Sequence, residues 1–266
     1  MTILRRITIA LLTVALLAPG MVRAASTTNF SDQWWIENES GWGASVLQQS
    51  DVLFIDLFVY GPDGKPTWFT AAAFLQGNAP AGHVLFTGDL HSTTGPYFGA
   101  GTFNPGAVGY VKVGTLTFDA ATINSARLSY SVNGVPVVKD VTRQTWRNEN
   151  LSGRYYGGDS GEQTNCGADN GHWETQTFME ITHAADNSMT MTVKDPQNRV
   201  QIFTGTYSQS GHMGQFVGTL SAPDQGFTGT FSFFEIERTI SGITGRGHGV
   251  LSTGCVWDGR FGGVRR

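Results

Sequence analysis

The sequence is poor in charged residues. Only 14% of its 266 residues are Asp, Glu, Lys or Arg, against about 25% in an average globular protein. Ala, Glu, Lys, Leu and Arg do not dominate the composition, which excludes a coiled coil or a helical bundle. Beyond the N-terminal region, no helical apolar pattern persists over about twelve residues. No stretch there is long and apolar enough for a transmembrane helix either.

Cysteine is almost absent, with only Cys166 and Cys255 in the chain. Neither has a Cys or His neighbour at the spacing of a zinc site. In an exported protein such a pair predicts one disulfide; two free thiols or a metal pair are the alternatives. The disulfide would close a loop of about 90 residues and stabilise the fold by about 4–5 kcal/mol in the chain-entropy model.

Motifs for cofactors and catalysis are also lacking. No phosphate-binding loop or dinucleotide fingerprint follows a strand, and the histidines are scattered, so we expect no cofactor and no metal site. The segment Gly158-Asp159-Ser160-Gly161 resembles the start of the nucleophile motif of trypsin-like proteases. Glu162 breaks that motif, and no histidine stands in the matching context. We therefore assign no catalytic residue.

Residues 1–24 have the pattern of a secretory signal peptide. Arg5 and Arg6 precede an apolar run from Ile7 to Ala18, and Val22-Arg23-Ala24 forms a small-residue cleavage site. The run is too short for an uncleaved membrane anchor, which needs about 20 residues. We expect a periplasmic or secreted bacterial protein.

Cleavage would leave a clearly acidic chain. Without the three arginines of the signal, 14 basic residues of the original 17 face 21 acidic ones, a net charge of −7. The basic residues are scattered, apart from the terminal Arg265-Arg266. This balance argues against nucleic acids and anionic membranes as partners, because both bind basic patches.

Glycine and aromatic residues are abundant by contrast. The chain has 35 glycines, 12% aromatic and 40% hydrophobic residues, so it can form a core and is not disordered by composition. The glycines have no three-residue period, which excludes collagen. Several of them fall inside expected strands, where glycine marks a bend or a close backbone approach; these are Gly114, Gly205, Gly218 and Gly229.

Strand and turn signals fill the rest of the chain. Val52 to Tyr60 turns through Pro62-Asp63-Gly64 into Pro66 to Phe74, and Asn133-Gly134 predicts a type I′ hairpin between 127–132 and 135–141. The remaining expected strands are 83–89, 108–118, 153–157, 173–182, 189–194, 199–208, 212–220, 226–236, 243–251 and 256–262, with a long loop at 91–106.

This pattern predicts an all-β fold made of two tandem antiparallel meander barrels or sandwiches of about eight strands each. A boundary at 148–151 divides the mature chain into an N-terminal domain, 25–150, and a C-terminal domain, 151–266. The competing arrangement is one continuous double sheet. A membrane barrel is disfavoured, since outer-membrane barrels resemble one another in ending on an aromatic residue and this chain ends in arginine.

The densest motif begins at Trp34-Trp35 and continues through Glu39-Ser40-Gly41-Trp42-Gly43 and Gln48-Gln49-Ser50-Asp51. Phe58-Val59-Tyr60, Gly64-Lys65-Pro66, Trp68-Phe69 and Thr93-Thr94-Gly95-Pro96-Tyr97-Phe98-Gly99 complete it. The chain thereby resembles an uncharacterised family of exported proteobacterial all-β proteins, also through Gly153–Gly158 and Gly259–Arg265. The resemblance implies export and an all-β fold, and gives no substrate or catalytic residue.

Four of the seven tryptophans lie within 35 positions, which suggests either a barrel core or a ligand site. The hypothesis is an exported, non-catalytic binding or interaction module for a glycan or an apolar small molecule. Its candidate ligand-binding residues are Trp34, Trp35, Glu39, Trp42, Gln48, Asp56, Tyr60 and Trp68. A secreted hydrolase using carboxylates such as Glu39 and Asp56, and a structural envelope protein, are the alternatives.

Asp56 is unusual because it stands between Phe54 and Phe58 on one face of an apolar strand. A carboxylate there needs a partner. It either pairs with an arginine such as Arg127 or Arg143, accepts backbone N–H bonds, or is a pocket carboxylate with a raised pKa. Glu37 and Glu39 resemble an acid pair, for which a turn or capping role is the alternative.

Overall fold

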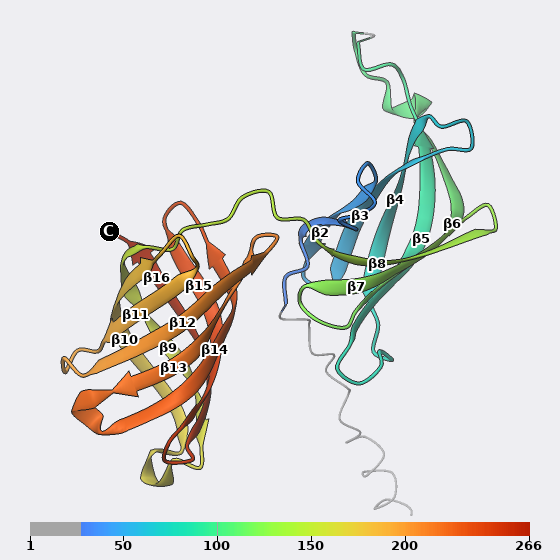
Figure 1. Ribbon diagram of the computed structural model, residues 1–266. Helices are drawn as coiled ribbons and strands as arrows, with labels where there is room; N and C mark the ends of the chain where they lie inside the picture. Colours follow the sequence, from blue (N-terminus) through green and yellow to red (C-terminus); the bar gives the residue numbers. More distant parts are fainter. Residues whose placement is uncertain (1–27, 100) are drawn as a thin grey trace, which may run out of the picture.

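The computed structural model describes residues 28–99 and 101–266, which fold almost wholly into antiparallel strands (Figure 1). The strands form two closed barrels of eight strands each, one after the other along the chain. The predicted all-β tandem fold is thus confirmed, and the competing continuous double sheet is wrong. The predicted signal peptide, 1–24, lies outside the described residues. In the part of the chain that is described, no helix is long and apolar enough to cross a membrane.

The first barrel is an up-and-down meander in which each strand pairs with the next. Its strands are β1 (Asp32–Trp35), β2 (Gly43–Gln49), β3 (Val52–Tyr60), β4 (Pro66–Leu75), β5 (Val84–Thr94), β6 (Gly109–Ala120), β7 (Ser125–Val132) and β8 (Val135–Arg143). The barrel closes where β1 meets β8, through Trp34 opposite Arg143 and Trp35 opposite Thr142.

The second barrel has the same meander order and a much longer closing pair. Its strands are β9 (Gly153–Thr164), β10 (Gly171–His183), β11 (Ser188–Lys194), β12 (Val200–Ser210), β13 (Met213–Ala222), β14 (Phe227–Arg238), β15 (Gly242–Leu251) and β16 (Val256–Arg265). Here β16 runs along nearly all of β9, from Val256 opposite Thr164 to Arg265 opposite Tyr155.

The local signals explain the hairpins. Asn133 and Gly134 both have positive φ, 48° and 83°, as a type I′ turn requires, and they connect β7 to β8. Glycines inside strands allow close backbone approach: a Cβ on Gly205 would clash with the carbonyl of Val217, and one on Gly218 with that of Thr204. The barrel can therefore curve tightly at β12 and β13.

Three segments differ from the expectation. Strands β1 and β2 were not predicted, since β1 is only four residues long and its aromatic motif masks the alternation. Strand β9 continues from the predicted end at 157 to Thr164, because β10 and β16 pair with it on both sides. Residues 91–94 belong to β5 rather than to the predicted loop at 91–106.

The interior of the N-terminal barrel is filled by side chains. Phe30 covers the end at which β1 begins and packs edge-on against Phe86 and Phe118, with ring centroids 6.0 and 5.7 Å apart. Trp34 packs edge-on against Phe118 at 5.0 Å. Around them lie buried aliphatic side chains from seven strands, among them Ala44, Val46, Leu53, Ile55, Leu57, Ala71, Ala73, Leu90, Leu116, Leu128 and Val141.

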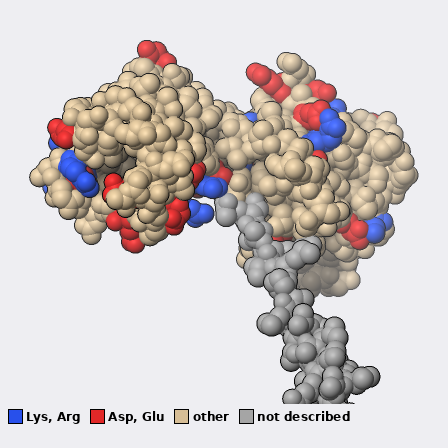
Figure 2. Space-filling model, turned by 90° about the horizontal axis from the view of Figure 1, so that it is seen from below, with Lys and Arg blue, Asp and Glu red and all other residues tan. Residues whose placement is uncertain are grey.

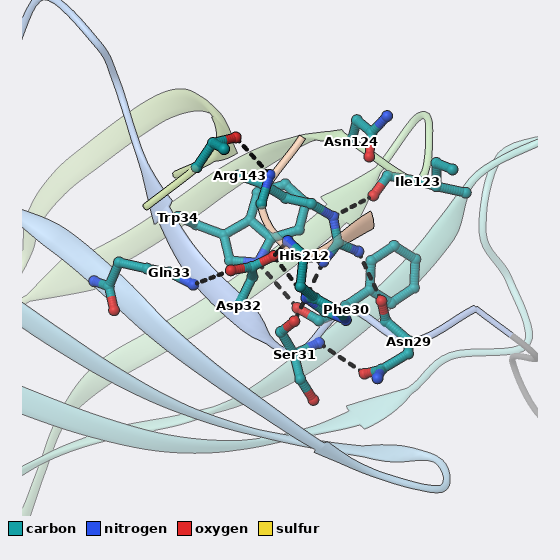
Figure 3. A network of polar contacts seen from close by, with 12 residues as sticks. Asn29, Phe30, Ser31, Asp32, Gln33, Trp34, Ile123, Asn124, Arg143 and His212 are labelled. Carbon is teal, nitrogen blue, oxygen red and sulfur yellow. Dashed lines mark hydrogen bonds and ion pairs between the residues drawn. The ribbon is translucent and has the colours of Figure 1, made fainter. Parts of the chain in front are cut away.

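A polar network joins the two barrels at the same end of the first one (Figure 3). The Arg143 guanidinium is buried and donates to the carbonyls of Asn29 and Ile123, at 2.7 and 2.8 Å, and to the Asp32 carboxylate at 3.2 Å. From the second barrel, His212 reaches the same carboxylate, with Nδ1 2.8 Å from Asp32 Oδ2.

The turn between β12 and β13 brings His212 to this position. Gly211, with a φ of 61°, packs so closely against Asp32 that a Cβ would clash with the carboxylate, and its N–H donates to Thr145 Oγ1 at 2.9 Å. His212 Nε2 lies 3.6 Å from Glu237 Oε1 of β14. The histidine thus links two carboxylates, one from each barrel.

The charges of this network determine its protonation. Hydrogen bonds to Asp32 and Glu237 raise the pKa of His212 to about 9, so the imidazole is protonated at neutral pH. Burial raises the pKa of Asp32, but hydrogen bonds and attraction to His212 outweigh it and hold that pKa below its ordinary value. The hydrogen bond from His212 also lowers the pKa of Glu237.

Candidate ligand-binding site

The predicted aromatic site divides between the interior, the rim and the outside of the N-terminal barrel. Trp34 is fully buried, at 0% exposure, and its Nε1 donates to the Phe30 carbonyl at 3.0 Å. The Arg143 guanidinium lies over its ring, 4.9 Å from the centroid. Trp34 therefore acts as a core residue that also contacts the inter-barrel network.

Trp42 and Glu39 lie together at the opposite end of this barrel. The Trp42 indole donates to Glu39 at 3.0 Å, and Lys139 forms an ion pair with the same carboxylate at 2.5 Å. The Lys139 ammonium lies 5.3 Å from the centre of the Trp42 ring. The hydrogen bond from Lys139 lowers the pKa of Glu39. Glu37 is exposed on the neighbouring loop.

Asp56, Tyr60 and Trp68 lie on the outer face of the sheet. Buried and exposed positions alternate along β3, and Asp56 shares the outward face with the exposed rings of Phe54 and Phe58. Burial beside these rings raises the pKa of Asp56. The expected partners are wrong: Arg127 pairs with Asp140, and Arg143 pairs with Asp32.

The remaining two candidates have local contacts. Trp35 is half-buried in β1. Gln48 holds the segment that precedes β1, because its Oε1 accepts a hydrogen bond from the Phe30 N–H at 2.7 Å. The eight candidates therefore do not line one common cavity. Their role in binding stays a prediction.

A cavity of about 890 Å³ lies instead inside the C-terminal barrel. Its lining includes residues from all four turns at the end remote from the N-terminal barrel, namely Cys166, Arg199, Gln225 and Thr253. Figure 2 looks onto the molecule from that side and shows the left-hand barrel hollowed, with charged side chains of both signs around the opening. The volume falls in the range of about 300–1,000 Å³ that small-molecule pockets occupy.

The opposite end of this barrel is closed by packing. Tyr155, Phe216, Ile236 and Ile243 are buried there, and the Tyr155 hydroxyl donates to the Leu151 carbonyl at 2.8 Å. The cavity is thus a cup whose floor faces the inter-barrel network and whose mouth faces solvent.

The walls of the cup carry eight aromatic and thioether side chains beside aliphatic and polar ones. The eight are Met179, Met191, Phe203, Phe227, Phe233, Phe261, Trp173 and Trp257. Glycines make room for the rings: a Cβ on Gly247 would come within 2.6 Å of Phe233 and 2.8 Å of Trp257. A Cβ on Gly259 would come within 2.8 Å of Trp173. The glycine-rich strands β15 and β16 thus leave space that inward-facing side chains would otherwise fill.

Two polar atoms in this wall lack partners. Asp159 Oδ1 and Thr177 Oγ1 are buried and accept or donate no hydrogen bond among the described residues. Thr177 is only 7% exposed. Burial raises the pKa of Asp159, although a hydrogen bond from the Trp173 indole partly offsets this. Such atoms cost free energy unless water or a ligand satisfies them.

A disulfide bridges the mouth of the cup at the point where β9 and β16 close the barrel. The predicted disulfide is confirmed: Cys166 and Cys255 are bonded, with their Cα atoms 4.4 Å apart. It links the β9–β10 loop to the β15–β16 turn, next to the Val256–Thr164 pair. In the β11–β12 turn, which also borders the mouth, Arg199 forms an ion pair with Asp195 at 2.6 Å.

No set of three or more His, Cys, Asp or Glu side chains among the described residues could hold a metal ion. The lining of the cup also includes Asp159, the aspartate of the false protease motif. Asp159 faces inward from β9, in the same alternation as the buried Tyr155, whereas Ser160 is its outward neighbour. The motif therefore has no nucleophile geometry, and its aspartate belongs to the cavity.

The cavity was not predicted from the sequence. A usable signal was present in β10, where the inward positions change from the short polar Thr175 and Thr177 to the apolar Met179 and Ile181. A second signal was the alternate glycines at 245, 247 and 249 of β15. Both patterns mark a barrel that is packed at one end and hollow at the other.

No family model, curated protein or solved structure matches the chain.

Proposed function

We propose that the C-terminal barrel binds a small, largely apolar molecule, and that the chain is an exported, non-catalytic binding protein. The observation that carries this proposal is the cup of about 890 Å³, whose lining combines aromatic and methionine side chains with polar residues. An eight-stranded barrel is just wide enough either to be filled by its own side chains or to hold one small ligand. The second barrel is only partly filled, and it opens to solvent at one end.

The lining favours an apolar ligand over a glycan. Glycan sites supply many hydrogen-bonding groups, whereas the deep part of this cup offers Met179, Met191, Phe203 and Leu220. Polar residues gather at the mouth, among them Gln163, Gln197 and Asp195. An apolar ligand with a polar end fits this gradient.

The disulfide supports export. Disulfides persist in oxidising compartments, and this one bridges the mouth of the cup. The disulfide thus supports the proposal of a periplasmic or extracellular protein, which the pattern of the N-terminal residues also predicts. The N-terminal barrel, filled by its own core, serves in this proposal as a rigid partner that covers the closed end of the cup.

The test is a titration with N-phenyl-1-naphthylamine, an uncharged apolar dye whose fluorescence rises in apolar surroundings. We expect saturable binding at one site, with energy transfer from Trp173 and Trp257. Thr177→Phe places a ring inside the cup and abolishes binding. Thr230→Phe, at an exposed outward position of β14, leaves it unchanged. Absence of saturable binding, or equal binding by both variants, contradicts the proposal.

A further inference from the structure

The wall of the cup contains two buried polar oxygen atoms that form no hydrogen bond with the described residues. Asp159 Oδ1 and Thr177 Oγ1 are both buried without a partner among the described residues, and both side chains line the cavity. Thr177 is more than nine-tenths buried. Natural structures leave few such atoms unsatisfied, and those that persist point to a bound water, ion or ligand.

The two side chains are neighbours on one face of the sheet. Asp159 lies opposite Thr175 in the β9–β10 pair, and Gly157 lies opposite Thr177. Thr177 is therefore the diagonal neighbour of Asp159, at a Cα separation of about 7–8 Å. One ligand atom between them can contact both oxygens.

Aromatic rings surround this position. Phe261 of β16 stands directly opposite Asp159 on its other side. Trp173 lies two residues before Thr175 in β10 and donates its indole hydrogen bond to the Asp159 carboxyl group. A carboxylate beside aromatic faces is the arrangement that binds an organic cation, through an ion pair and through attraction to the ring faces.

The charge of the cavity favours the same class of ligand. The acidic residues of its lining are Asp159, Asp169, Glu174 and Asp195, and the basic ones are Arg199 and Arg260. Arg199 is already paired with Asp195. Arg260 and Glu174 are both exposed and belong to the outward faces of β16 and β10, which leaves Asp159 inside the cup and Asp169 at its mouth. An anionic headgroup therefore meets a net repulsive site, and a cationic one an attractive site.

We propose that the ligand is a cationic amphiphile: an apolar chain or ring system bearing one protonated primary amine that binds between Asp159 and Thr177. This inference rests on the proposed binding function and specifies its ligand class. The ammonium group supplies up to three donors, which satisfy both orphan oxygens, while the apolar body occupies the space between the methionine and phenylalanine walls.

The experiment compares three ligands with the same chain, octylamine, 1-octanol and octanoate, as competitors of N-phenyl-1-naphthylamine at neutral pH. We expect octylamine to displace the dye at a roughly tenfold lower concentration than octanol, as one charge-assisted hydrogen-bonded contact predicts. Octanoate is the weakest competitor. Equal displacement by all three ligands overturns the inference, while dye binding itself leaves the proposed function intact.

Variants identify the residues responsible. Asp159→Asn removes the preference for octylamine over octanol without abolishing dye binding. Asp258→Asn is the matched control, because it removes the same charge from an exposed outward position of β16. Retention of the amine preference by Asp159→Asn overturns the inference.

Thr177→Val provides a second, uncharged test if Asp159→Asn does not fold. It keeps the side-chain volume and removes the hydroxyl, so octylamine affinity falls severalfold while dye binding persists. Unchanged octylamine affinity in this variant also contradicts the proposal. Failure of the dye to bind the unaltered protein is a different result, since it refutes the binding function itself.

Discussion

The two barrels have the same number of strands and the same meander order, yet one is filled and the other encloses a cavity of about 890 Å³. In the first, inward positions carry side chains that meet across the axis, such as Trp34, Phe86 and Phe118. In the second, inward glycines in β15 and β16, together with Thr175 and Thr177 in β10, leave the axis open. Strand topology alone therefore does not decide whether a small barrel has a core or holds a ligand.

The two barrels also differ in how their first and last strands pair to close the sheet. The first barrel closes over two residue pairs and adds the buried Arg143–Asp32 contact at that point. The second closes along nearly the whole of β9 and β16 and adds a disulfide at its open end. A hollow barrel has fewer packing contacts across its axis, so the long closing pair and the disulfide support its wall.

Removing the disulfide should have the largest effect, and only on the second barrel. The bond spans a sequence separation of 89 residues, so Cys166→Ser with Cys255→Ser should lower the free energy of unfolding by about 4–5 kcal/mol in the chain-entropy model. Hydrogen exchange followed by mass spectrometry reports each barrel separately. Protection should fall in β9–β16 and persist in β1–β8; an equal loss in both would contradict the assignment of the disulfide's effect to the second barrel.

The two barrels should respond differently to loss of a tryptophan. Trp34 is fully buried, so Trp34→Ala should cost about 3–5 kcal/mol through lost packing and a large void. Trp257 is half-buried against the cavity, so Trp257→Ala should cost only about 1–2 kcal/mol. Denaturant unfolding measures both values. Similar costs would mean that the two interiors are packed alike.

The contact between the barrels should weaken at alkaline pH. The pKa of His212 is raised to about 9, above its unfolded value of about 6.5, so its stabilising contribution is complete below about pH 6.5. It is lost as pH rises through about 9. The imidazole is partly exposed, and solvent screening reduces the expected loss to about 1–2 kcal/mol.

Unfolding measured between pH 6 and pH 10 tests this expectation. His212→Gln should flatten the alkaline decrease in stability, whereas His248→Gln should not, because His248 pairs with Asp258 on the outside of the second barrel. At the acid side, the lowered pKa values of Asp32 and Glu237 mean that their contributions are lost as pH falls below about 4. An alkaline decrease of equal size in both variants would assign it to other groups.

The smallest effect is a gain in stability. The folded-state pKa of Asp159 is raised by burial, so the stability linked to its protonation is present at low pH and lost as pH rises through that pKa. At neutral pH its charge is a cost, and Asp159→Asn should stabilise the protein by about 0.5–1.5 kcal/mol while reducing amine binding. Asp258→Asn should change stability by less than about 0.5 kcal/mol. Destabilisation by Asp159→Asn would indicate a structural role for the carboxylate.

The sequence predicted the tandem barrels because turn chemistry and strand alternation are local properties. Asn133-Gly134 and Pro62-Asp63-Gly64 each define a hairpin without help from the rest of the chain. The disulfide also followed from composition and compartment alone. Strands β1 and β2, the glycine-rich end of β9 and residues 91–94 of β5 were not predicted, because pairing with neighbouring strands rather than their own residues determines them.

The cavity could not be predicted in the same way. It depends on which inward side chains meet across the barrel axis, and these come from strands far apart in sequence, such as β10 and β16. Clustering along the chain drew attention to Trp34 and Trp42, which lie at opposite ends of the filled barrel. The walls of the cup, Trp173 and Trp257, are 84 positions apart by number and share no motif.

Methyl NMR during a titration with octylamine most directly tests the claim that the ligand binds inside the second barrel, because the interiors of both barrels contain methyl groups. Binding inside the cup should shift the signals of Met179, Met191 and Leu220, which line the cavity. The signals of Leu53, Leu90 and Leu128, buried in the first barrel, should stay in place. Shifts confined to the first barrel, or none in either interior despite saturable binding, would contradict the assignment of the second barrel as the container.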